Sequence, residues 1–108
     1  MTDSRDYLFR KVLQERKRQD ELHGEENKIT QLLPKNITKE TVKELLYLVK
    51  EMEEEHKEQG QSWLEIILEE VFETFSETDP KKSRIELIQV TAVCFQMLEK
   101  IENGELTL

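Results

Sequence analysis

The chain contains few of the residues that build turns and covalent cross-links. Its 108 residues include three glycines, two prolines and one cysteine. This scarcity argues against a β-sandwich or β-barrel, in which many short strands need many turns. Cys94 cannot form an internal disulfide, and such cysteine usage fits a reducing, cytoplasmic location. We expect Cys94 to be a small buried residue and not a nucleophile, because the sequence places no basic partner beside it.

Acidic residues outnumber basic ones, and long apolar runs are scarce. The chain has 16 lysines and arginines against 24 aspartates and glutamates, a net charge of -8. Nonspecific binding to nucleic acid needs a basic surface and is therefore not expected. No apolar run approaches the length of a transmembrane helix, and the N-terminus lacks the apolar region of a signal peptide, so we expect no membrane association. An anionic small substrate stays compatible with this charge if a metal ion screens it.

What the sequence does contain is helical periodicity. Its hydrophobic fraction of 36% and charged fraction of 37% suit one core built from helices with wide solvated faces. Ser62 and Glu65 have the spacing of a capping box, and Asp79 with Pro80 would open a further helix. The predicted helices cover about residues 3–23, 38–60, 62–77 and 80–103. We therefore expect a single all-α domain over residues 1–108, folded as a four-helix bundle.

Acidic residues interrupt the apolar segments of the last two predicted helices. In "LEEVFETF", Glu69, Glu70 and Glu73 lie on one side of a helix. The opposite side is an apolar arc of Leu64, Ile67, Leu68, Val71 and Phe75. In "RIELIQVTAVCFQML", Glu86 and Gln89 share the narrow polar side of a helix that is apolar almost all round and should therefore be buried. The short turn "SETDPKKS" predicts antiparallel packing, which brings Glu73 level with Glu86.

Carboxylates that converge in a partly buried place indicate a divalent metal ion. They repel one another, and burying unpaired charge is costly. A hard divalent cation relieves both penalties, and ligand sets made only of oxygen favour Mg²⁺ or Mn²⁺. The alternative is an ordinary solvated helix surface, but Glu86 favours the metal because its helix has little exposed face to offer.

These residues resemble the all-α nucleoside triphosphate pyrophosphohydrolase superfamily, which includes MazG-like proteins and dimeric dUTPases. The family pattern is two glutamates, two spacers and a glutamate, followed after a gap by a glutamate, two spacers and an aspartate. Here it reads "EEVFE" at 69–73 and "ELIQ" at 86–89. The segment "ERKRQDELHGEEN" is also similar to an N-terminal segment of small MazG-like proteins. Gln89 departs from the family aspartate and would be a ligand without charge.

The resemblance implies hydrolysis of a nucleoside triphosphate to the monophosphate and pyrophosphate, as in house-cleaning of nucleotides. Mg²⁺ would be the cofactor, with Mn²⁺ as an alternative. The implied metal ligands are Glu70, Glu73, Glu86 and Gln89, and Glu69 would be the catalytic residue that orients water. A second hypothesis is a catalytically inactive helical interaction or regulatory module that retains the fold, and Gln89 is the residue that favours it.

Basic residues near this pattern are candidates for binding the substrate. Lys81, Lys82 and Arg84 occupy the first turns of the last predicted helix, where their charge could hold the phosphates. Arg18 and Gln19 lie in the family-like N-terminal segment and could contact the substrate. The alternative is that all five are ordinary exposed side chains, some of which balance nearby acids.

The distribution of apolar residues predicts an assembly. Ile66 lies within the acidic side of its helix, and the last helix is apolar almost all round. A chain of 108 residues is too small to cover both Ile66 and the apolar surface of the last helix by itself. We therefore expect a homodimer or homotetramer.

Two histidines suggest a rival metal site. "DELH" and "EEEH" each place an acid three residues before His23 or His56, which is the spacing found in di-iron helix bundles. In an up-and-down bundle, His23 and Glu86 would lie at one end and His56 at the other. The ligands would not converge, so this interpretation is the less favoured one.

Overall fold

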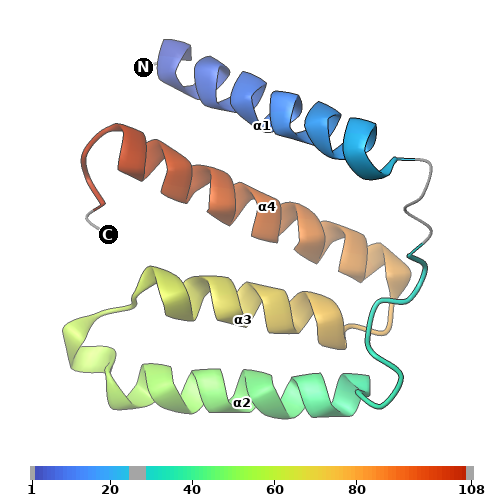
Figure 1. Cartoon of the computed structure of the whole chain (residues 1–108). Helices are drawn as coiled ribbons and strands as arrows, with labels where there is room; N and C mark the ends of the chain where they lie inside the picture. Colours follow the sequence, from blue (N-terminus) through green and yellow to red (C-terminus); the bar gives the residue numbers. More distant parts are fainter. Residues whose placement is uncertain (1, 25–28, 107–108) are drawn as a thin grey trace. The chain divides into compact units, whose positions relative to one another are not determined.

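The computed structural model describes residues 2–24 and 29–106, and within these ranges it contains four α-helices, one short 3₁₀-helix and no strand (Figure 1). The helices are α1 (Thr2–His23), α2 (Lys39–Glu55), the 3₁₀-helix η1 (Lys57–Gln59), α3 (Trp63–Ser76) and α4 (Pro80–Glu102). The all-α class predicted from the sequence is confirmed. None of the described helices is both long enough and apolar enough to cross a membrane.

Local capping signals fix the starts of α3 and α4. The Ser62 side chain accepts a hydrogen bond from the backbone N–H of Glu65, and Glu65 Oε1 accepts one at 3.1 Å from the backbone N–H of Ser62. Asp79 Oδ1 accepts the backbone N–H of Lys81 at 2.9 Å. These bonds satisfy N–H groups that the first turn of a helix leaves without a partner. Both helices therefore begin at the predicted residues.

The end of α2 differs from the sequence prediction. The helix ends at Glu55, about one turn before the predicted end, and is followed by the 3₁₀-helix η1. Gly60 then has φ +83, a left-handed conformation that favours glycine. The tight connection lets the chain reverse direction before Ser62.

The chain divides into two compact units, which are described separately. One unit comprises α1 and the chain from Phe95 onward. In it, the Phe9 and Phe95 rings lie 6.4 Å apart, and the Arg5 guanidinium pairs with Glu99 at 3.0 Å. The other unit is Leu32–Cys94, which contains α2, α3 and the first part of α4. The single domain over 1–108 stays a prediction.

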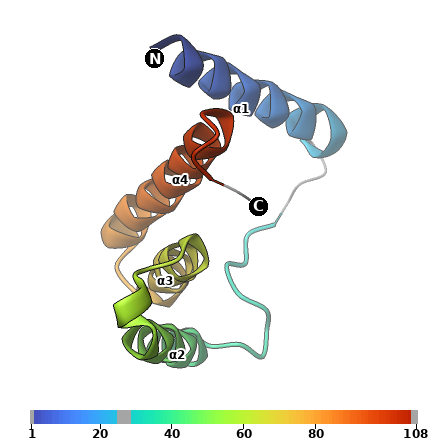
Figure 2. The same cartoon turned by 90° about the vertical axis from the view of Figure 1, so that its left-hand side faces the viewer.

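The helices α2 and α3 form an antiparallel hairpin, and they are the pair in closest backbone contact (Figures 1 and 2). Val42, Leu46 and Val49 of α2 are buried. Their spacing of four and then three residues places them on one face of the helix. This hairpin supports the candidate site.

The expectation that α4 is buried is wrong for the single chain. None of the residues of α4, all of which are described, is buried, and Ile85, Leu87 and Ile88 are each 53% exposed. Cys94 is exposed as well, which corrects the expectation of a buried thiol. The physical reason is that the first part of α4 contacts α3 near the connecting turn but does not pack along it.

Candidate functional site

Helix α3 buries part of its acidic side. Its two buried residues are Glu65, 5% exposed, and Thr74, 4% exposed. Leu64, which the sequence places in the apolar arc, is 62% exposed. The carboxylate of Glu65 therefore occupies a position in the hairpin that an apolar side chain usually holds, and burying it needs compensation.

One group of carboxylates lies between α2 and α3 and consists of Glu53, Glu65 and Glu69. Glu53 follows Val49 by four residues and so continues the buried face of α2. A hydrogen bond shared with Glu69, followed by burial and by the charges of Glu69 and Glu65, raises the pKa of Glu53 from 4.5 to about 7. In the described part of the chain, Glu53 Oε1 and Glu65 Oε2 are buried and receive no hydrogen bond from a donor.

A second group of carboxylates lies where α3 meets the start of α4 and consists of Glu70, Glu73, Glu77 and Glu86. Burial and the charges of Glu70 and Glu69 raise the pKa of Glu73, although Lys50 opposes the shift. Burial and then the charges of Glu77 and Glu70 raise the pKa of Glu86. The charge of Glu86 is the smallest of the causes that raise the pKa of Glu73, and the close approach of these two residues stays a prediction.

Polar contacts hold this second group in place. The Thr74 hydroxyl donates to the Glu70 carbonyl at 2.8 Å, within α3. The Ser83 hydroxyl of α4 donates to the Thr74 carbonyl at 3.3 Å, and Lys39 Nζ of α2 donates to the Glu77 carbonyl. The end of α3 is thereby tied to both neighbouring helices, which fixes the backbone that carries the acids.

The chemistry of the second group fits a hard divalent cation. Among the described residues, Glu70 Oε2 and Glu86 Oε2 are buried without a hydrogen-bond partner, and both side chains are oxygen donors. The ligand geometry is not closed, because no group of three or more His, Cys, Asp or Glu residues in the described ranges is arranged to hold an ion. The acids repel one another in the absence of a cation, and closing a site requires rotation of their side chains.

The other residues predicted to belong to the site are exposed on α4 or belong to the other unit. Gln89 is exposed, as are Lys81, Lys82 and Arg84. Lys82 is close enough to Glu86 to oppose the rise of its pKa, which burial causes. In the other unit, Arg18 pairs with Glu15 at 2.6 Å, and Gln19 accepts a hydrogen bond from Arg16 at 2.9 Å. The proposed roles of all six residues stay predictions.

The rival histidine site gains no support. His56 is exposed at the end of α2. The side chain of His23 lies outside the described residues.

Sequence reasoning missed four residues of this acidic region, namely Glu53, Glu65, Glu77 and Lys50. Glu77 carried a signal, because it follows Glu73 by one turn, whereas nothing in the sequence distinguishes Glu53 from its acidic neighbours. Glu65 was interpreted only as a capping residue. Lys50 gave no signal, because it is one of several lysines on α2.

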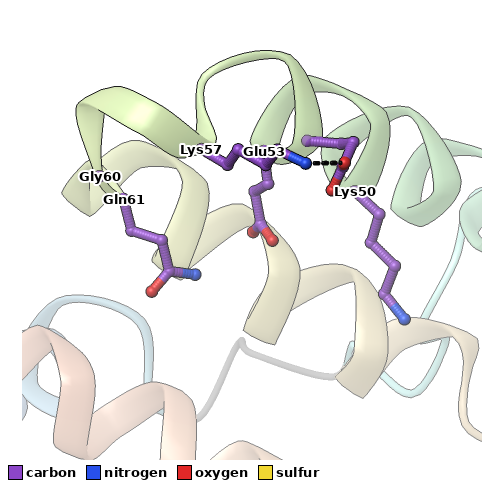
Figure 3. Close-up of a pocket in the computed structure, with 6 residues that line it drawn as sticks. Lys50, Glu53, Lys57, Gly60 and Gln61 are labelled. Atoms are coloured by element: carbon purple, nitrogen blue, oxygen red, sulfur yellow. Dashed lines mark hydrogen bonds and ion pairs between the residues drawn. The ribbon is translucent and has the colours of Figure 1, made fainter.

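A pocket of about 280 Å³ opens beside the first group of carboxylates (Figure 3). It is lined by Lys50, Glu53, Glu54, Lys57, Gly60 and Gln61. Figure 3 shows the Glu53 side chain directed from α2 toward α3, while Lys57 pairs with Glu54 at 2.7 Å. Solutes can therefore approach the first group from this side.

Comparison of the chain with models of protein families, with curated proteins and with solved structures finds no match. The geometry of the acids and the resemblance in sequence pattern are therefore the grounds for a functional proposal.

Proposed function

We propose that the chain is a Mg²⁺-dependent nucleoside triphosphate pyrophosphohydrolase of the MazG-like, all-α type, acting as a homodimer or homotetramer in the cytoplasm. The observation that carries the proposal is that Glu70 Oε2 of α3 and Glu86 Oε2 of α4 are both buried without a hydrogen-bond partner among the described residues. Mutual repulsion contributes to the raised pKa of Glu73 and Glu86, after burial as the main cause. Buried oxygens without hydrogen-bond partners and raised pKa values are both expected of carboxylate ligands when no cation is bound.

Each side chain has a defined task in this proposal. Glu70, Glu73 and Glu86 would hold the metal ion, and Gln89 would add a neutral amide oxygen. When bound, Mg²⁺ neutralises phosphate charge and lowers the pKa of a water molecule. Glu69 orients the attacking water and accepts its proton as the bond between the α- and β-phosphates breaks. Cleavage then gives the nucleoside monophosphate and pyrophosphate.

Basic residues at the start of α4 complete the site. Lys81, Lys82 and Arg84 are exposed there and close in sequence to Glu86, so they can bind phosphate oxygens. Lys82 is the one whose charge already acts on Glu86, where it opposes the rise of the pKa caused by burial. It is therefore our first choice among the three for a phosphate contact.

A catalytically inactive helical interaction or regulatory module is the second candidate. Gln89 favours it, because this residue is exposed and carries no charge. The absence of a closed metal-ligand arrangement in the described ranges also favours it.

A pyrophosphate-release assay over a panel of nucleoside triphosphates, with Mg²⁺ and with Mn²⁺, separates the two candidates. We expect turnover by the wild type and a loss of about 100-fold or more in Glu73→Gln, because a direct metal ligand is removed. Glu55→Gln is the matched control, since Glu55 is exposed on α2 and belongs to neither group of carboxylates. Circular dichroism checks that each variant is folded.

The contrary results are equally specific. If none of the nucleotides is hydrolysed and neither metal changes the melting temperature, the interaction module is favoured. Full turnover by Glu73→Gln would remove Glu73 from the site while leaving the enzymatic activity in place.

A further inference from the structure

Helix α2 has a second apolar side, which lies in solvent. Its buried side consists of Val42, Leu46 and Val49. Leu45 and Leu48 lie three residues apart on a different side of the helix, and they are 39% and 59% exposed. Apolar side chains that lie together in solvent are typical of a contact surface. This side of α2 is therefore a candidate for binding a partner.

Acidic side chains flank the exposed apolar side of α2. Glu44 and Glu51 lie seven residues apart, which places them on the same side of the helix, next to Leu48. Both are exposed, and neither forms an ion pair with a residue in the described ranges 2–24 and 29–106. A partner that covers Leu48 should therefore carry positive charge at the matching positions.

Helix α1 carries a surface of this kind. Arg10, Leu13 and Lys17 lie on one side of the helix, and all three are exposed. Neither cation forms an ion pair with another described residue. Leu13 is 51% exposed, whereas Leu8 of the same helix is buried. The structure thus leaves an apolar residue of α1 in solvent between two cations.

The spacing of the two surfaces matches when the helices run antiparallel. On α1 the leucine lies three residues after one cation and four before the other. On α2 the leucine lies four residues after one acid and three before the other. Antiparallel alignment therefore sets apolar against apolar and basic against acidic side chains, in the pairs Arg10 with Glu51, Leu13 with Leu48 and Lys17 with Glu44.

We propose that α1 of one copy of the chain packs antiparallel on α2 of a second copy through these three pairs. One chain carries both halves of the contact, so two identical chains complement each other and the contact occurs twice in a dimer with twofold symmetry. Burial of the two leucines supplies attraction, and the flanking charges fix register and direction. The inference rests on the assembly in the proposed function and not on its hydrolytic activity.

Charge reversal on one helix at a time tests the contact, with sedimentation equilibrium of the full chain as the measurement. Every chain carries Ile88→Glu, which opposes association through the exposed apolar side of α4. We expect this parent chain to dimerise at micromolar concentration. Glu44→Lys with Glu51→Lys should raise the dissociation constant at least about tenfold, because like charges then face one another. Arg10→Glu with Lys17→Glu should do the same.

Mixing the two charge-reversed chains in equal amounts shows whether the contact joins different copies. Each chain repels its own copies, whereas α1 of each complements α2 of the other. We therefore expect the mixture to associate to within about twofold of the parent chain. Glu58→Lys with Glu102→Lys is the matched control, because it changes the net charge as the α2 reversal does, at exposed positions outside both surfaces. Its dissociation constant should change by less than about twofold.

Four other results would overturn the inference. If the parent chain is a monomer and the wild type an oligomer, association runs through α4 alone and the proposed assembly stands. If both are monomers, the assembly fails as well, while pyrophosphate release still tests the activity separately. If charge reversal leaves the dissociation constant unchanged, the three pairs do not form. If mixing restores nothing but all four reversals in one chain restore its melting temperature, the contact lies within one chain.

Discussion

At the scale of single residues, the sequence reveals some acids of the site and hides others. Glu70, Glu73 and Glu86 stand out because each interrupts an apolar segment. Glu53 has an equally inward position but lies in the acidic run "EMEEEHKE", where no local pattern distinguishes it from its neighbours. The rotation of α2 about its own axis decides which residue of that run faces α3. The buried position of Val49 reveals this rotation, and it is known only from the structure.

Glu53 should make the stability of the metal-free protein depend on pH. Its pKa, raised mainly by the hydrogen bond with Glu69, is about 7 in the folded chain against an ordinary value of 4.5. Between these values the folded chain holds more protons than the unfolded chain, so the free energy of unfolding falls as the pH rises. In EDTA, we expect the wild type to melt at a lower temperature at pH 8 than at pH 5.

Glu53→Gln should remove much of that pH dependence and stabilise the protein at pH 8. Because the side chain is partly accessible to solvent, we expect a gain of only about 1 kcal/mol, or roughly 4–8 °C in Tm. Thermal unfolding followed by circular dichroism measures both effects, with Glu54→Gln as the control. An identical pH profile in wild type and Glu53→Gln would contradict the hydrogen bond between Glu53 and Glu69.

At the scale of the elements, the helix starts were predictable and the burial of the helices was not. Ser62 with Glu65, and Asp79 with Pro80, act on backbone groups within a few residues, so their spacing alone places α3 and α4. The exposure of α4 depends on contacts with distant parts of the chain, or with another chain, which local periodicity does not encode. The inward turn of Glu65 was missed for the same reason.

Loss of the capping hydroxyl should weaken the start of α3. Ser62→Ala removes an acceptor for the Glu65 backbone N–H and a donor to Glu65 Oε1, and we expect a cost of about 1 kcal/mol. Urea unfolding measures this loss, and Ser62→Thr, which keeps a hydroxyl, should recover most of it. Equal stability of Ser62→Ala and the wild type would show that this capping box contributes little.

At the scale of the whole molecule, the core of a single chain is small. The buried apolar residues among those described are Leu8, Val42, Leu46 and Val49. Many large apolar side chains are instead exposed, including Leu64 on α3 and Ile88 on α4. A domain of this size is only marginally stabilised by its own core, so covering such surface in an assembly is favourable.

A second copy of the chain should cover α4. We expect the wild type to sediment as a dimer or tetramer at micromolar concentration. Ile88→Glu should raise the dissociation constant of the assembly at least about tenfold, because a charge would be buried in the contact between chains. Gln96→Glu, at another exposed position of α4, is the control and should change less. A wild type that sediments as a monomer would contradict the expected assembly.

The capping box at the start of α3 has a practical consequence, because it lies beside a natural optical probe. Trp63, the single tryptophan of the chain, is the first residue of α3 and lies half-buried between Ser62 and the exposed Leu64. Its indole emission depends on the polarity around it. Fraying or tightening of this turn can therefore be followed by intrinsic fluorescence, without attaching a dye or altering any acidic side chain.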